Sequence, residues 1–163
     1  MAKTIDRRVC AEIEGPFVIF MIGARINRPW KLNVVVPFIA TMPRMLGELA
    51  AKPELGLLHV RQHFNGTSVM LIQYWRGFEE LEAYARAPDK AHLPAWQWFN
   101  KALGSNGDIG IWHETYLIQP GNYENIYNNM PPFGLGAAGT LVDAVGARQS
   151  AHQRMRAAAK EAA

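Results

Sequence analysis

The chain has 163 residues, of which 49% are hydrophobic and 19% charged, and this composition excludes a disordered protein. Its net charge of +3 comes from residues 148–163, which hold four basic residues and one acidic residue, whereas the remaining residues carry 13 of each sign. Because a nucleic-acid-binding domain normally carries its basic patch on the folded body, we expect no nucleic-acid partner. The basic residues of the tail are expected to be solvated, so that cutting the chain at Arg148 would change stability little.

Targeting signals and disulfides are not predicted. No apolar run reaches the roughly 18–20 residues of a membrane helix, so we expect no integral membrane segment. The N-terminus, "MAKTIDRRVCAEIEG", lacks the apolar core of a signal peptide. Cys10 is the single cysteine and has no partner within the chain for a disulfide. Together these features predict a cytoplasmic protein.

Four segments have the pattern of β-strands. The first and the third are apolar at successive positions, which is typical of strands covered on both faces. The dipeptide "NG" at residues 65–66 predicts a tight hairpin between the second and the third. In chain order, the predicted strands are residues 16–26, 55–64, 67–75 and 109–118.

Helices are predicted between these strands. Over residues 35–51, apolar residues recur at helical spacing, with Pro37 in the first turn and a kink expected at Pro43. Residues 77–87 and 92–104 are predicted to form a second helix that is broken near Pro88. A surface helix is expected over residues 137–160.

The order of strand, helix, two strands, helix and strand predicts an α+β fold of the ferredoxin-like βαββαβ type. Its helices cover one face of the sheet, and the other face is also apolar. We therefore expect a second copy of the chain to cover it, which would form a homodimer with a dimeric α+β barrel. The predicted parts are an N-terminal arm at residues 1–14, the barrel domain at 15–120, and a C-terminal wrapping segment with its basic tail at 121–163.

The stretch "GLGAAG", residues 134–139, matches the dinucleotide-binding pattern G-x-G-x-x-G. That pattern has meaning only after a strand and within a βαβ unit. Here "NMPPF" precedes it and 24 residues follow, which we judge too few for a second strand. We interpret the stretch as a glycine-rich turn that passes close to the body.

His92 opens a helix in which Trp96 and Phe99 follow on the same face, at i+4 and i+7. Its ring is therefore expected to face the core or a cavity. Three interpretations stay open: a structural histidine that bonds a neighbouring carbonyl, an axial ligand of haem iron, or a proton carrier. The five tryptophans and seven methionines of the chain suit an apolar cavity wall as well as plain packing.

The last predicted strand, "IGIWHETYLI", carries several polar residues. His113 and Thr115 share one face, and Trp112, Glu114 and Tyr116 share the other. A buried Glu114 would act as a base with a raised pKa, or would pair with an arginine such as Arg25, Arg61 or Arg76. No group of residues has the spacing of a metal site, since His59 and His63 lie about 13 Å apart along a strand.

Four motifs, "YWRGFEELEAYAR", "HLPAWQWFN", "IGIWHETYL" and "YENIYNNMPPFGLG", resemble the monooxygenase-like family named after a member of the fumagillin pathway. The resemblance covers about residues 15–139. It implies a dimeric α+β barrel related to the antibiotic-biosynthesis monooxygenases, and a role in secondary metabolism. Barrels of this type include cofactor-independent oxygenases as well as haem enzymes such as chlorite dismutases and aldoxime dehydratases.

We therefore expect an oxidoreductase that acts on a small, largely apolar molecule between the sheet and the helices. The alternatives are an enzyme dependent on haem b, such as a dehydratase or peroxidase-like enzyme with His92 as axial ligand, and a non-catalytic ligand-binding dimer. No metal ligands are assigned. The predicted catalytic residues are His92, His113 and Glu114, and the predicted pocket residues are Trp75, Arg76, Trp96, Phe99, Tyr116 and Met130.

Overall fold

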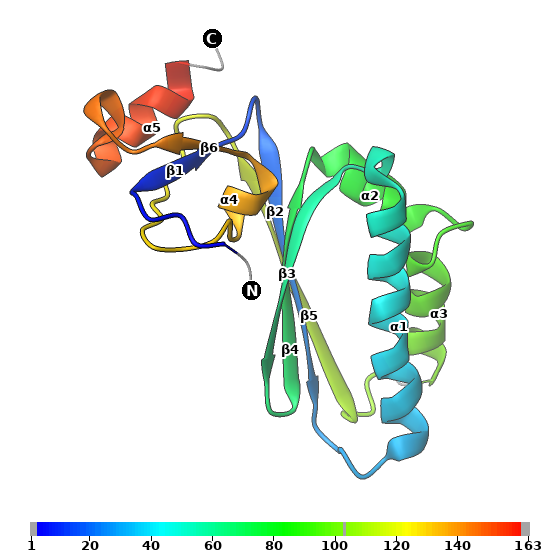
Figure 1. Cartoon of the computed structure of the whole chain (residues 1–163). Helices are drawn as coiled ribbons and strands as arrows, with labels where there is room; N and C mark the ends of the chain where they lie inside the picture. Colours follow the sequence, from blue (N-terminus) through cyan, green and yellow to red (C-terminus); the bar gives the residue numbers. More distant parts are fainter. Residues whose placement is uncertain (1–2, 103, 161–163) are drawn as a thin grey trace.

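The structure, a computed structural model, describes residues 3–102 and 104–160. A four-stranded antiparallel sheet lies at its centre, with the strand order β3-β4-β2-β5, and three helices cover one of its faces (Figure 1). This arrangement confirms the predicted ferredoxin-like α+β fold. The elements are β2 (Phe17–Ile26), α1 (Leu32–Ala51), the short helix η1 (Pro53–Leu55), β3 (Leu57–Asn65), β4 (Ser68–Trp75), α2 (Phe78–Arg86), α3 (His92–Ala102) and β5 (Ile109–Ile118).

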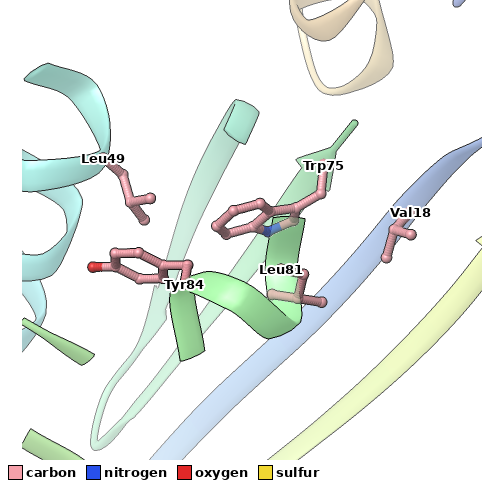
Figure 2. Packing of buried hydrophobic residues seen from close by; sticks show 5 residues of the cluster. All are labelled: Val18, Leu49, Trp75, Leu81 and Tyr84. Atoms are coloured by element: carbon pink, nitrogen blue, oxygen red, sulfur yellow. The ribbon is translucent and has the colours of Figure 1, made fainter. Parts of the chain in front are cut away.

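The main core lies between the sheet and the helices. Trp75 at the end of β4 is fully buried, and it packs with Val18, Leu49, Leu81 and Tyr84 (Figure 2). Its indole Nε1 donates a hydrogen bond of 2.8 Å to the side-chain oxygen of buried Gln73. A polar group without a partner would be costly at this depth, so this bond permits the tryptophan to fill the core.

Helix α1 continues through both of its prolines, Pro37 and Pro43. Contrary to the expectation from the sequence, it is long and apolar enough to cross a membrane by length and composition. This is weak evidence for a membrane span, because the core helix of a globular protein meets the same criteria. Val35 and Leu49 of this helix are buried against the rest of the fold.

The two ends of the chain form a second unit, here called the terminal unit. In it β1 (Val9–Glu12) pairs antiparallel with β6 (Thr140–Asp143), accompanied by α4 (Leu135–Ala138), η2 (Gly146–Arg148) and α5 (Ala151–Lys160). The expected helix over 137–160 is therefore wrong, and so is the expectation that no strand could follow the glycine-rich stretch, because residues 140–143 form a strand that pairs with β1. The predicted close passage of the glycine-rich stretch is confirmed, since a Cβ on Gly139 would collide with the carbonyl oxygen of Glu12.

The terminal unit lies on the sheet face opposite the helices, at one end of the strands (Figure 1). Phe17 of β2 packs there with Ala11, Ile13 and Leu135, and the ring of Tyr123 meets Phe17 edge-on at 5.1 Å. This chain thus covers part of the face that the sequence analysis assigned to a second copy. The rest, which includes Trp112 and Tyr116 of β5, stays exposed in the single chain.

The basic tail is not simply solvated, contrary to the expectation from its composition. Arg148 binds both carboxylate oxygens of Glu12, at 2.6 and 3.1 Å. Arg154 is 7% exposed, contacts the Glu124 carboxylate at 2.7 Å, and donates to the carbonyl oxygens of Arg148 and Gln149. These arginines tie α5 to the terminal unit, so the net charge of the tail is partly structural.

Replacing Arg154 with alanine is therefore expected to destabilise the protein by about 2–3 kcal/mol, because Glu124 and two carbonyl groups would lose their partner. Urea unfolding followed by circular dichroism measures this change. The matched control is Arg156→Ala on the exposed side of the same helix, which should stay within about 0.5 kcal/mol of the wild type. Equal stability of the two variants would show that α5 does not depend on the Arg154 contacts.

Candidate active site

A cavity of about 260 Å³ lies between the sheet and the three helices. It opens toward β5, since His113, Thr115 and Trp96 line it and are also exposed. Its wall is mainly apolar, and the polar side chains in it are few. The lining residues are Phe20, Ile22, Met42, Met45, Leu46, Leu49, Gln73, Trp75, Phe78, Leu81, Glu82, Tyr84, Ala85, His92, Trp96, Ile111, His113 and Thr115.

His92 is held in this wall by the end of the preceding helix. Its Nδ1 lies 3.0 Å from the carbonyl oxygen of Ala85, in the last turn of α2, where carbonyl groups lack helical partners. A carbonyl oxygen only accepts, so this contact favours the tautomer in which Nδ1 carries the proton and Nε2 has the lone pair. The bond to the Ala85 carbonyl agrees with the structural interpretation of His92. The same ring also lines the cavity, so it can have a second role.

Glu48 of α1 positions the start of α3. Its carboxylate accepts the backbone N–H of Ala91 at 2.8 Å and the hydroxyl of Tyr84 at 3.3 Å, and it also contacts Lys52. The Ala91 N–H is the main cause that lowers the pKa of Glu48, and burial together with the Glu48 charge raises the pKa of Tyr84. Because Ala91 precedes His92, this carboxylate fixes the backbone that carries the histidine.

Three residues of the cavity and its rim, Glu48, Tyr84 and Gln73, are not predicted from the sequence. Glu48 had a detectable signal, because it is the single carboxylate within residues 15–53 and stands beside the apolar face of its helix. Tyr84 and Gln73 had no such signal in the sequence, because a tyrosine on a helix and a glutamine in a strand are ordinary surface or core residues. Their role depends on contacts between elements far apart in the sequence.

The structure brings together four of the predicted site residues, His92, His113, Trp75 and Trp96, around one cavity. On β5, the ring of His113 lies 5.6 Å from that of Phe20 and belongs to the helix-facing side of the sheet. Phe99 lies behind the wall, where its ring stacks on Trp96 at 5.8 Å.

The other predicted residues lie elsewhere. Glu114 and Tyr116 are on the opposite sheet face, where the tyrosine hydroxyl donates to the carboxylate at 2.6 Å, which raises the pKa of Tyr116. Arg76 is exposed and contacts the carbonyl oxygen of Glu14 at 3.4 Å. Met130 belongs to the terminal unit, where its carbonyl accepts from the N–H of Ile5.

A second hollow of about 600 Å³ lies outside, between α1 and the start of α3. Charged side chains line it, including Arg44, Glu48, Asp89 and Lys90, so it resembles a solvated groove. Within residues 3–102 and 104–160, no group of three or more His, Cys, Asp or Glu residues could hold a metal ion.

The Glu48 contacts predict a dependence of stability on pH. A carboxylate whose pKa is lowered on folding stabilises the folded state above its unfolded pKa, near 4.3, and this contribution is lost as pH falls through the folded pKa. Glu48→Gln should therefore be less stable than the wild type at pH 7, and the difference should shrink below about pH 4. Urea unfolding at both pH values tests this, with exposed Glu14→Gln as the control expected to show no such change.

Three comparisons place the chain among known proteins. The family model "Monooxygenase af470-like" matches residues 17–135. Monooxygenase af470 of Aspergillus fumigatus is 30% identical over an alignment of 158 positions, which covers 83% of this chain and 55% of that protein. The chain therefore spans about half the length of this curated relative.

Two solved structures of aldoxime dehydratases share the fold. One, in complex with butyraldoxime, has a TM-score of 0.69 at 15% identity and covers 85% of this chain and 44% of its own. The other has a TM-score of 0.67 at 17% identity, and the match covers 88% of this chain and 45% of the aldoxime dehydratase chain. At these identities the likeness to the aldoxime dehydratases concerns the fold alone. The family model, in contrast, matches residues 17–135, which contain the four-stranded sheet, its three helices and the cavity. The chain belongs to the monooxygenase af470-like family.

Proposed function

We propose that the chain is a monooxygenase-like oxidoreductase that binds a small, largely apolar molecule in the cavity between the sheet and the helices. The proposal rests on the position of His92 in the apolar wall of the cavity. Its Nδ1 is bonded to the carbonyl oxygen of Ala85, so its Nε2 can act as an acceptor toward a bound molecule. A relative named as a monooxygenase supports the reaction class. A cytoplasmic location and a role in secondary metabolism stay predictions.

The lining limits the kind of molecule that would bind. A volume of about 260 Å³ lies below the range of roughly 300–1,000 Å³ typical of drug-sized ligands. The lining residues include no lysine or arginine, so a neutral molecule suits the cavity better than an anion. The imidazoles of His92 and His113 and the hydroxyl of Thr115 would orient its polar atoms.

An oxidation that needs no added reductant fits these residues. His92 Nε2 would take a proton from an activated methylene group, and the resulting carbanion would give its electrons to O₂ and form a C–O bond. Loss of water then leaves a carbonyl, so that one O₂ and one methylene give one carbonyl and one water. The substrate supplies all four electrons, and the histidine returns its proton to the water.

Haem b is the second interpretation carried over from the sequence. The Nε2 atom of His92 is a suitable iron ligand. The cavity itself does not fit the group, because about 260 Å³ is small for a rigid macrocycle and, among the described residues, no lysine or arginine lines it to pair with the two propionates. No step of the reaction is therefore assigned to haem.

We also propose that a second copy of the chain covers the exposed part of the sheet face opposite the helices. Trp112, 41% exposed, lies flat across Gly23 there, since a Cβ on that glycine would meet the indole at 2.5 Å. Tyr116, on the same face of this strand, is 46% exposed. Exposed apolar residues in one contiguous area are typical of interaction sites.

The His92 proposal is tested with oxygen uptake in the presence of anthrone, a neutral apolar reporter whose methylene is acidified by its rings and carbonyl. His92→Gln should stay folded and lose activity by about 10²–10⁴-fold, because the amide cannot act as a base. His152→Ala, an exposed histidine on α5, is the control and should keep full activity. A wild type that binds anthrone, as seen by tryptophan quenching, but consumes no oxygen would indicate a ligand carrier. A Soret band in the purified protein would favour haem.

The dimer is tested by sedimentation velocity at micromolar concentration. The expected species has about twice the mass of the 18.2 kDa chain. Tyr116→Asp should shift it toward the monomer, because a charge would be buried in the apolar contact. Val145→Asp, at an exposed position in the terminal unit, should leave the dimer intact. A wild type that sediments as a monomer would contradict the model of a dimeric barrel.

A further inference from the structure

One end of the molecule gathers three loops, here called the loop end. It consists of residues 27–31 between β2 and α1, residues 66–67 in the β3–β4 turn, and residues 104–108 before β5 (Figure 1). The N–H of Ile26 donates to the carbonyl of Thr67 at 2.9 Å, and the N–H groups of Asn27 and Arg28 donate to the carbonyl of Asp108. These bonds fix the loops next to one another, at the end of the sheet away from the terminal unit.

Large apolar side chains project from the loop end into solvent. Phe64 beside the hairpin turn is 75% exposed, and Trp30 in the connection before α1 is 71% exposed. Leu32 and Val36, one turn apart at the start of α1, are also exposed. Single exposed apolar residues are ordinary, but several on neighbouring loops form a patch of the kind that marks an interaction site.

The same end is strongly basic. Arg25, Arg28, Lys31 and Lys101 lie on or beside these loops, and the carboxylate found there among the described residues is Asp108. Asp108 is 3% exposed and is bound by Lys31 and Arg28, at 2.8 and 2.7 Å, which lowers its pKa. Residues 15–47, 55–78 and 90–107, which supply the loops, contain no aspartate or glutamate. The loop end therefore presents net positive charge around an apolar patch.

We propose that the loop end docks on a membrane surface that contains anionic phospholipids. Trp30, Phe64 and Leu32 would enter the boundary between headgroups and acyl chains, where aromatic side chains are favoured. The four cations would lie at the level of the phosphates, where each basic residue adds attraction. Charge complementarity selects this occupant, because a second copy docked on the same patch would place four cations against four. Nucleic acid would leave Leu32 and Val36 without apolar contacts.

Sedimentation with lipid vesicles tests the proposal. Wild-type protein should pellet with vesicles of phosphatidylcholine and 30% phosphatidylserine in 0.1 M salt, and release should follow at 0.5 M salt. Little should pellet with pure phosphatidylcholine. The double variants Trp30→Ser with Phe64→Ser, and Arg25→Glu with Lys101→Glu, should each bind at least about tenfold more weakly.

The matched control combines Val145→Ser with Arg156→Glu, an exposed apolar residue and an exposed cation of the terminal unit, and it should bind as the wild type does. Thermal unfolding of all variants verifies that they are folded. Equal binding to both lipid compositions, no binding, or an equal loss in the control would each overturn the proposal. Vesicle binding replaced by oligonucleotide binding, or by self-association that the Trp30 and Phe64 changes abolish, would assign the patch to nucleic acid or to a second copy.

Discussion

The constraint on which this structure depends is a four-stranded sheet with large apolar side chains on both faces. On one face, Val18 and Trp75 require the helices, and on the other, Phe17 requires the terminal unit. Neither cover is complete. The helices leave a cavity above the middle of the sheet, and the terminal unit leaves β5 exposed beyond its end. Two of the three places to which a function is assigned, the cavity and the proposed contact between copies, are therefore gaps in the covering of one sheet.

The candidate site combines structural and chemical demands in the same side chains. His92 satisfies the carbonyl of Ala85 at the end of α2, and Glu48 satisfies the N–H of Ala91 at the start of α3. These bonds join the broken second helical segment, which would otherwise expose backbone groups at both of its inner ends. Because the Nδ1 atom of His92 makes the bond to α2, its Nε2 atom is available to a bound molecule. A site built in this way costs little stability, since the histidine has a structural partner.

Much of the fold could be predicted from local patterns, because strand alternation, helical spacing and the "NG" turn act over a few residues. This holds for β2, β4, α1 and the β3–β4 hairpin. The terminal unit could not, because β1 and β6 have four residues each and become strands only by pairing with one another. The site divides in the same manner. The helical stripe of His92 and Trp96 was visible in the sequence, whereas alternation along β5 could not show that the helices take the face of His113 and leave that of Glu114. The bond between Glu48 and Ala91 spans 43 positions and leaves no periodic trace.

The pairing of β1 with β6 also constrains how the protein folds. Glu12 and Arg148, which form an ion pair in this unit, are separated by 136 positions, so every strand and helix of the sheet domain must be synthesised before they meet. The sheet and its helices contain the local hairpin and can form first. Phe17 and its neighbours then stay exposed to solvent until the terminal unit packs on them. Long-range closure of this kind is slow, and an uncovered apolar sheet face is prone to aggregation. Residues that follow the whole sheet in the chain, such as Leu135, thus protect Phe17 in the first strand of that sheet.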